Sequence, residues 1–334
     1  MARRKKRTTK VVITGISGRL GQLLARRLHR LPDHEIIGID RRLFPRCPKD
    51  VEHLRIDIRR KACEDLFRRK QIDVIYHLGL MHDPRRSSQE HHTWNILGTQ
   101  RVFDYASRHG VPKVVVLSST DVYGPQDDNP AFISEDAPLL GAQRFSQIRD
   151  LISVDMMAQS YFWKAPEIET VVLRPVHILG GVNNAMSNYL RMTRPPVIFG
   201  FDPMMQVIHE EDLISAIVAA STPGLRGIYN ITGPDALPLR RLVELAGRTP
   251  LEVPHFVAPV IARQAWTMHL LNAPAAELAY LRFAVTVDGT RATKLLRLAP
   301  QYSAAQSAQA ARRLGVYDAE ADAARSVALT APTR

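Results

Sequence analysis

Short apolar runs alternate with amphipathic stretches along the first half of the chain. Six runs are rich in β-branched residues and predict strands, and they cover residues 10–14, 35–40, 51–57, 72–78, 114–118 and 170–174. The segments between them, notably 20–31, 94–109 and 148–162, carry apolar residues at helical spacing. Strands that alternate with helices predict a parallel sheet with helices on both faces, connected by right-handed crossovers.

The pattern loosens after Pro175. We expect helices over 183–192 and 210–221, short strands over 197–199 and 206–208, and a strand over 227–232 that returns to the sheet or its neighbour. The sequence therefore predicts an α/β protein with a doubly wound parallel sheet of the Rossmann type and a smaller, mostly C-terminal substrate lobe. The expected divisions are a basic disordered tail (1–8), a Rossmann domain (9–175), a substrate-binding lobe (176–316) and a flexible tail (317–334).

Composition excludes several classes of protein. Of the 334 residues 45% are hydrophobic, which is enough for a sizeable core. The two cysteines, Cys47 and Cys63, exclude a disulfide framework and favour a reducing, cytoplasmic setting. No window holds a membrane-spanning length of uninterrupted apolar residues, so we expect no membrane span. Because no cysteine or carboxylate lies at ligand spacing from His91 and His92, we expect no metal site.

The net charge of +12 owes part of its size to the opening run of residues 3–7 (RRKKR). No apolar stretch of the signal-peptide type follows this run, so it predicts a solvated basic tail. A nucleic-acid interaction through the tail is the alternative. We consider it the weaker one, because no nucleic-acid fold signature accompanies the charge.

A glycine-rich segment, residues 14–21 (TGISGRLG), follows the first strand and opens the first helix. In this context the first glycine permits a tight turn, the second lets the backbone approach a pyrophosphate, and the third lets helix and strand pack closely. The start of the helix then offers free N–H groups and the positive end of a dipole. We expect dinucleotide contacts from Gly15, Ser17, Gly18, Arg19 and Leu20.

The second apolar run ends at Asp40, at the distance from the glycines where an acidic residue accepts hydrogen bonds from the adenosine ribose. This favours NAD as the cofactor, because a carboxylate at that point repels the 2′-phosphate of NADP. Arg41 and Arg42 follow directly and offer a grip for that phosphate, so NADP stays the alternative.

Further motifs follow in chain order. They are Asp57-Ile58, His77-Leu78-Gly79-Leu80, Asn95-Ile96-Leu97-Gly98-Thr99, residues 118–124 (SSTDVYG), Leu173-Arg174-Pro175 and residues 208–213 (IHEEDL). Together with the glycine-rich turn, they resemble the extended and atypical short-chain dehydrogenase/reductases, the NAD-dependent epimerase/dehydratase family. The resemblance implies that Asn95 fixes a helix distortion near the active site. It also implies cofactor contacts from Asp57, Ile58, Leu78, Gly79, Leu80, Asn95, Ser118, Arg149 and Pro175, beside Asp40 and Arg41.

One departure from the family concerns the acid/base group. Its members usually carry Tyr-x-x-x-Lys on the helix after the SSxxVYG strand, where the tyrosine exchanges a proton with substrate and the lysine holds the nicotinamide ribose. The aligned residues here are Phe145 and Arg149. Phenylalanine has no ionisable proton, whereas arginine stays charged and can still hold a ribose, with a fork that differs from an ammonium.

Two hypotheses follow from this departure. In the first, another group serves as acid/base; the candidates are Ser119, Tyr123, His82 and His177, and the expected catalytic set is Ser119, Tyr123 and Arg149. In the second, the chain binds NAD(P) without hydride chemistry, as a sensor or scaffold.

The substrate lobe departs as well. The resemblance implies an arginine for a nucleotide diphosphate shortly before residue 208, but Met204 and Met205 stand there. Either these methionines line an apolar site or they belong to the core. Arg191 and Arg282 are the remaining candidates for a cation in the substrate site. The leading function is therefore an NAD(P)-dependent oxidoreductase or isomerase that acts by hydride transfer on a small or moderately apolar hydroxy or keto substrate.

A nucleotide-sugar epimerase or dehydratase is the further alternative. The resemblance also implies a homodimer built on the helices over 94–109 and 148–162. The loop after Gly124, with its acidic pairs Asp127-Asp128 and Glu135-Asp136, is expected to form a solvated lid.

Overall fold

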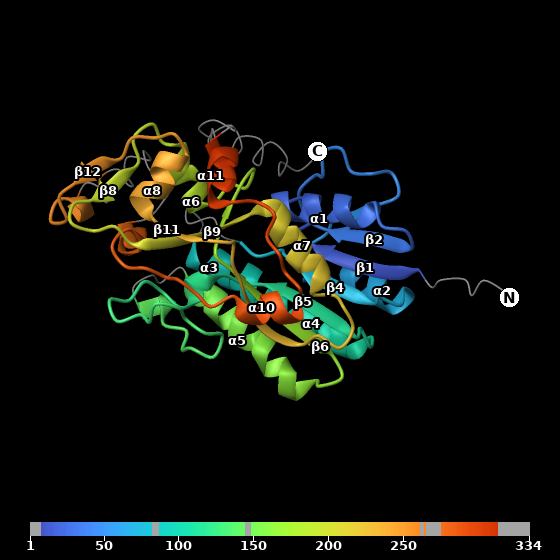
Figure 1. Ribbon diagram of the computed structural model, residues 1–334. Helices are drawn as coiled ribbons and strands as arrows, with labels where there is room; N and C mark the ends of the chain where they lie inside the picture. The colour runs from blue at the N-terminus through green and yellow to red at the C-terminus, as the bar shows by residue number, and fades with distance from the viewer. Residues whose placement is uncertain (1–7, 82–86, 144–147, 261–263, 265–274, 313–334) are drawn as a thin grey trace.

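Seven parallel strands form the main sheet, in the order β10-β6-β5-β4-β1-β2-β3 (Figure 1). The structure is a computed structural model and describes residues 8–81, 87–143, 148–260, 264 and 275–312. The strands are β1 (Thr9–Thr14), β2 (His34–Ile39), β3 (Glu52–Leu54), β4 (Val74–His77), β5 (Lys113–Leu117), β6 (Glu169–Pro175) and β10 (Gly227–Ile231). This confirms the predicted doubly wound α/β fold.

The strand order reverses between β1 and β4. From β1 the chain proceeds outward through β2 and β3, and then returns to β4 on the other side of β1 and proceeds through β5 and β6 to β10. In open parallel sheets, ligands bind in the crevice at the carboxyl ends of the strands at such a reversal. The fold therefore places the ends of β1 and β4 at the centre of the expected cofactor site.

Helices cover both faces of this sheet (Figure 1). On one face α1 (Arg19–His29) and α7 (Glu210–Ala219) pack against alternate residues of β1, Val11 and Ile13. On the other face α2 (Lys61–Arg69), α4 (Gly98–Arg108) and α5 (Arg149–Lys164) share a core with the intervening residue, Val12. Because both faces are buried, the strands consist of continuous apolar runs without polar alternation.

The chain before α4 contains the short helix α3 (Ser88–His92) and one turn of π-helix, η1 (Thr93–Leu97). The single helix expected over 94–109 is therefore two elements, and β3 is shorter than the run expected over 51–57. The strand expected over 227–232 lies in the main sheet, beside β6.

The smaller lobe has a core of its own. A three-stranded sheet, β11-β9-β7, and a strand pair, β12-β8, pack with α6, α8 and α11. The elements are β7 (His177–Leu179), α6 (Ala185–Arg191), β8 (Pro196–Ile198), β9 (Met204–His209), β11 (Ala236–Pro238), α8 (Leu239–Leu245), β12 (Leu251–Val253), η5 (Ala275–Leu281), α10 (Thr290–Leu295) and α11 (Ala304–Arg312). Of these, α10 packs against β10 of the main sheet. No helix within the described part of the chain is long and apolar enough to cross a membrane. Most of both expected tails and residue His82 lie outside the described residues.

Candidate cofactor and active site

The turn after β1 presses against the turn after β4. Gly15 has φ +74°, and a Cβ at this position would lie 2.7 Å from Gly79 Cα. A Cβ on Gly21 would lie 2.4 Å from the Gly15 carbonyl oxygen, whereas one on Gly18 would meet that oxygen at 3.2 Å. Among the described residues, no side chain caps the start of α1. The turn thus leaves backbone N–H groups for an anionic group.

A buried histidine joins the two turns. The Thr99 hydroxyl donates to the Asn95 carbonyl at 2.6 Å, so it accepts from His77 Nε2 at 2.9 Å. His77 Nδ1 then accepts from the Thr14 hydroxyl at 2.7 Å, and the same hydroxyl accepts from Gly79 N–H. Burial lowers the pKa of His77 to about 4, so this ring is neutral and structural.

The π-helical turn η1 holds the segment after β4. Asn95 Oδ1 accepts from Met81 N–H at 2.7 Å, and Asn95 Nδ2 donates to the Met81 carbonyl at 3.0 Å. Trp94 Nε1 donates to the Gly79 carbonyl at 2.7 Å. The buried Asn95 therefore sits in a helix distortion next to the switch point, where the resemblance places it.

The carboxylate of Asp40 faces the glycine-rich turn and is also covered by an arginine. Its Oδ2 accepts from Ser17 N–H at 3.2 Å and from Arg42 Nη2 at 3.0 Å, and its Oδ1 accepts from Arg42 Nε at 3.1 Å. Asp40 is buried, while the Arg42 side chain is 60% exposed. The expected ribose contact is thus paired with a cation that solvent can reach.

Asp57 and Ile58, two of the expected cofactor contacts, are likewise tied to neighbours. Asp57 accepts from Arg59 Nε at 2.8 Å and from Arg59 Nη2 at 2.5 Å, and the Ile58 carbonyl accepts from Tyr105. Burial of Asp57 opposes its charge, but the hydrogen bonds and the charge of Arg59 outweigh it and hold the pKa of the Asp57 carboxyl below its ordinary value.

Arg19 joins the turn to α7, the helix that lies beside α1 on the same face of the main sheet. Its Nε and Nη2 donate to the two oxygens of the buried Glu210 at 3.1 and 2.5 Å. The hydrogen bond with Glu210 raises the pKa of Arg19. Gly180 and Gly181 lie against this ion pair, and a Cβ at either position would lie within 3 Å of it. The side chain of Arg19 is therefore held by α7, while 44% of it stays exposed.

Two of the residues expected in the site belong to a buried polar network at the end of β6. The Ser118 hydroxyl donates to Asp155 Oδ2 at 2.7 Å, and Arg174 binds both oxygens of Asp155 at 2.9 and 2.7 Å. The Tyr123 hydroxyl accepts from Arg174 and donates to Asn230 Oδ1, each at 2.8 Å. We therefore leave Tyr123 out of the catalytic set and assign the Ser118 side chain a structural role.

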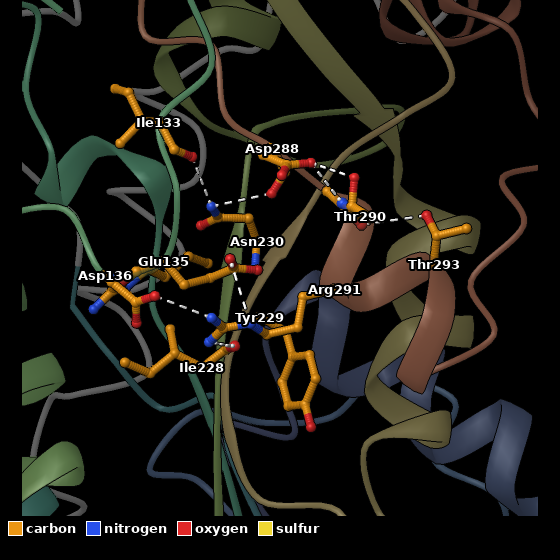
Figure 2. A network of polar contacts seen from close by, with 12 residues as sticks. Ile133, Glu135, Asp136, Ile228, Tyr229, Asn230, Asp288, Thr290, Arg291 and Thr293 are labelled. Atoms are coloured by element: carbon orange, nitrogen blue, oxygen red, sulfur yellow. Dashed lines mark hydrogen bonds and ion pairs between the residues drawn. The ribbon is translucent and has the colours of Figure 1, made fainter. Parts of the chain in front are cut away.

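The same network includes the loop that the sequence predicts to be a solvated lid (Figure 2). Glu135 is buried, and its Oε1 accepts from Asn230 N–H at 3.1 Å. Asn230 Nδ2 donates to the carbonyls of Ile133 and Asp288, and Arg291 pairs with Asp136 at 3.2 Å. The prediction of a solvated lid was wrong for Ile133 and Glu135, which are buried against β10 and the segment leading into α10, whereas Asp136 is exposed.

A cluster of polar side chains stands at the edge of the sheet, between β5 and β7. The Ser119 hydroxyl donates to Asp121 Oδ2 at 2.9 Å, and the ring centroids of His177 and Tyr280 are 6.0 Å apart. The Tyr280 hydroxyl donates weakly to the Asp121 carbonyl at 3.5 Å. Burial lowers the pKa of His177, and the charge of Asp121 opposes that shift. The Asp121 carboxylate thus binds the Ser119 hydroxyl and also acts electrostatically on the neutral imidazole of His177.

The motif order and this geometry agree with a comparison against protein families, in which residues 11–232 match the NAD dependent epimerase/dehydratase family. The chain belongs to this family. The expected resemblance is confirmed, and the expectation of NAD is supported at the level of the family, whose description names it.

Other proteins resemble the chain over nearly its whole length. An uncharacterized protein of Mycobacterium bovis is 27% identical over 311 residues, which is 89% of this chain and 81% of that protein. UDP-glucuronic acid 4-epimerase from Bacillus cereus, solved with NAD, is 19% identical with a TM-score of 0.70 and covers 92% of this chain and 99% of its own. dTDP-glucose 4,6-dehydratase from Bacillus anthracis, also solved with NAD, is 17% identical with a TM-score of 0.69, over 91% and 96%. At these identities the two enzymes show a shared fold.

Within this family framework, Arg149 stands on the exposed side of α5. It is the first residue of α5 and is exposed, whereas the buried face of the helix carries Leu151 and Asp155. Arg149, Met156 and Trp163 follow at intervals of seven residues, so they share the exposed face of the helix. We therefore leave Arg149 out of the catalytic set; Phe145 lies outside the described residues.

The family's substrate lobe contains a pocket in this chain, with a cavity volume of about 430 Å³. Phe132, Met204 and Arg282 line it, and the Arg282 guanidinium lies 4.8 and 5.0 Å from the ring centroids of Phe201 and Phe283. Met205 is buried core. Arg191 is also buried and donates to the carbonyls of Val182 and Ala311, so Arg282 is the cation left for a ligand.

The remaining expected contacts lie where the sheet edge meets the crevice. Leu20, Leu78 and Leu80 are half-buried against the core, and Pro175 ends β6. No group of three histidine, cysteine or acidic side chains suited to a metal ion occurs among the described residues. Sequence reasoning missed Tyr280, since nothing in its surroundings marks a residue 161 positions after Ser119. Sequence reasoning also missed Asp121, although its position two residues after Ser119 on the same turn could have identified it as a partner of that serine.

Proposed function

We propose that the chain is an NAD-dependent oxidoreductase or isomerase that transfers a hydride in the crevice between β1 and β4. The backbone contact of Gly15 with Gly79 supports this proposal. It brings the turns after β1 and β4 together at the carboxyl ends of these strands, beside the uncapped start of α1. Asp40 would accept hydrogen bonds from the adenosine ribose hydroxyls, and the N–H groups at the uncapped start of α1 would hold the pyrophosphate. NAD, when bound, supplies the hydride acceptor or donor.

The proton transfer falls to His177. Its neutral imidazole can accept a proton from a substrate hydroxyl, and Asp121 stabilises the imidazolium that results. Ser119 keeps the catalytic role expected of it, because its hydroxyl can hydrogen-bond to the same substrate oxygen while it donates to Asp121 in the resting site. Tyr280 packs its ring against that of His177 and so limits the ring's orientation.

The pocket around Arg282 supports the substrate class. Two of the three chain segments that form the proposed catalytic cluster, 119–123 and 275–281, continue directly into the walls of the pocket at Gln126 and Arg282. Its surface combines phenyl rings, the Met204 thioether and the Arg282 guanidinium with the side chains of Gln126, Asp127 and Asn129. Such a surface favours a moderately apolar hydroxy or keto compound with a single anionic group. With methionines in place of the family's arginine, it offers little for a nucleotide diphosphate.

We also propose that the protein forms a homodimer through η1, α4 and α5. Met156 is 59% and Trp163 is 86% exposed on one face of α5, and Leu97 of η1 is 43% exposed. Since η1 and α5 are in contact, these exposed apolar side chains stand on two neighbouring elements. Apolar patches on the surface of a folded domain mark interfaces.

Calorimetric titration with NAD, NADH, NADP and NADPH tests the proposed function, with Gly18→Asp as the control. A Cβ at residue 18 would lie 3.2 Å from the Gly15 carbonyl oxygen, which a shift of a few tenths of an ångström relieves, and the variant places a carboxylate where the pyrophosphate would bind. Circular dichroism checks that the variant is folded. We expect tight binding of NAD that the variant loses. Binding of none of the four would overturn the proposal.

Turnover then separates the possible activities. We expect the protein to reduce NAD to NADH when apolar 2-hydroxy acids are supplied. We expect no turnover with UDP-glucose or UDP-glucuronate. Turnover of the nucleotide sugars would instead favour epimerase or dehydratase chemistry. Cofactor binding without any turnover would favour a sensor or scaffold.

A further inference from the structure

The indole of Trp94 is fixed beside the switch point. Its Nε1–H donates to the Gly79 carbonyl at 2.7 Å, and Gly79 is the residue whose backbone meets Gly15. Asn95, the next residue, pairs with both backbone groups of Met81. One edge of the ring is therefore anchored to the segment after β4, and its orientation is set before any ligand arrives.

Two arginines from separate elements approach this ring. The guanidinium carbon of Arg41 lies 4.1 Å from the ring centroid, and that of Arg59 lies 5.3 Å from it. Arg59 is held by Asp57 through two charge-assisted hydrogen bonds, while Arg41 is exposed. The charge of Arg41 also contributes to lowering the pKa of Asp57. Arg59 is thus the fixed cation of the pair, and Arg41 is the one with freedom to leave.

This contact spans the part of the crevice that an adenosine must occupy. In the sheet β1 lies between β2 and β4. Arg41 follows the end of β2 directly after Asp40, and Trp94 comes from the segment after β4. A side chain from one side that touches a ring from the other must pass over the end of β1, which is the glycine-rich turn.

We infer that Trp94 is the stacking platform for the adenine of the cofactor, and that Arg41 occupies its face until the cofactor arrives. The inference rests on the proposed function and extends it to a residue outside the expected cofactor set. A guanidinium and an adenine are both flat and both stack on an indole, so one can replace the other. The displaced Arg41 stays next to Asp40, where its charge can meet the pyrophosphate.

Calorimetry on the full chain tests the platform with three probes: ADP, NAD and nicotinamide mononucleotide, which has no adenine. We expect Trp94→Ala to weaken the binding of ADP and of NAD by the same factor, roughly tenfold or more, because each ligand loses one base–aromatic stack. Nicotinamide mononucleotide should bind the variant and the unmodified protein equally. Trp94→Phe should restore most of the affinity for ADP, since it keeps a ring but loses the N–H donor.

The matched control is Trp163→Ala, which removes an exposed tryptophan from α5. It should leave ADP binding unchanged. A variant with Trp163→Phe and Trp266→Phe keeps Trp94 as the single tryptophan, and its fluorescence should respond to ADP but not to nicotinamide mononucleotide.

Two results would overturn the inference. One is Trp94→Ala binding ADP within twofold of the unmodified protein. The other is Trp94→Phe losing as much affinity as Trp94→Ala, which would mean that the bond to Gly79 and not the ring face matters. The proposed function fails separately, if neither ADP nor NAD binds the unmodified protein.

Discussion

The glycine-rich turn after β1 and the catalytic edge after β5 lie at the same end of one sheet but are held together differently. At the first, backbone lies against backbone, as Gly15 meets Gly79. At the second, side chain binds side chain, as Ser119 binds Asp121 and Ser118 binds Asp155. A backbone contact permits glycine alone, whereas a side-chain site can change its chemistry without changing the fold. This explains how the chain keeps the family's cofactor turn while Phe145 stands at the aligned tyrosine position.

The largest effect is expected where backbone meets backbone. Gly15→Ala combines a positive φ, which costs about 1–3 kcal/mol, with a Cβ placed 2.7 Å from Gly79 Cα. We expect a loss of several kcal/mol in the free energy of unfolding and loss of measurable NAD binding. Urea denaturation and calorimetry measure the two effects.

Gly110→Ala is the matched control for this change. Gly110 has φ +64°, but a Cβ there would meet no atom within 4 Å. This variant should lose only about 1–2 kcal/mol, the cost of the left-handed conformation. Equal losses in the two variants would mean that the contact between the turns adds nothing.

A substitution in the proposed catalytic cluster should change the turnover rate and leave the affinity for NAD unchanged. We expect His177→Gln to lower turnover by roughly 10²- to 10⁴-fold, the usual contribution of a general acid/base, and to leave NAD affinity unchanged. Because burial lowers the pKa of His177, oxidation of a hydroxyl should decline only at pH values below the ordinary histidine range. Initial rates across pH check both points. An unchanged rate, or an unchanged acid limb in the pH profile of the variant, would remove His177 from the mechanism.

The buried histidine between the two regions should make stability depend on pH. Its folded pKa of about 4 is below the unfolded value near 6.5, so the unfolded chain binds more protons between these values. Stability is therefore fully present above about pH 6.5 and falls as the pH drops toward 4, by about 3 kcal/mol. Urea denaturation of His77→Gln should show a flatter dependence than the unmodified protein. Parallel curves would assign the loss to other groups.

Sequence reasoning reached these two regions unequally. The glycine spacing, Asp40 and Asn95 could be placed from the sequence, because a turn, a strand end and a helix are local and their constraints fall on residue type. Ser119 and His177 could be named as candidates, but their association with Asp121 and Tyr280 could not be predicted, because it forms only after three segments have packed together. Ser118 and Tyr123 match the motif in residue type, yet their hydroxyls bind the buried side chains of Asp155 and Arg174. Motif spacing does not determine which way a side chain points.

Arg149 illustrates the same limit, and its position leads to the prediction with the smallest expected effect on the folded monomer. An ungapped alignment pairs Arg149 with a cofactor lysine, but helical periodicity puts it on the exposed face with Met156 and Trp163.

If that face is a dimer interface, Trp163→Glu should weaken dimerisation at least about 30-fold, because it buries a charge at an apolar anchor. Phe256→Glu changes an equally exposed aromatic on the other lobe and should leave assembly unchanged. Sedimentation equilibrium measures both variants, and their melting temperatures should match that of the unmodified protein under conditions where it is monomeric. A monomer at all concentrations of the unmodified protein would leave the face without a partner copy and would detach Arg149 from assembly as well as from catalysis.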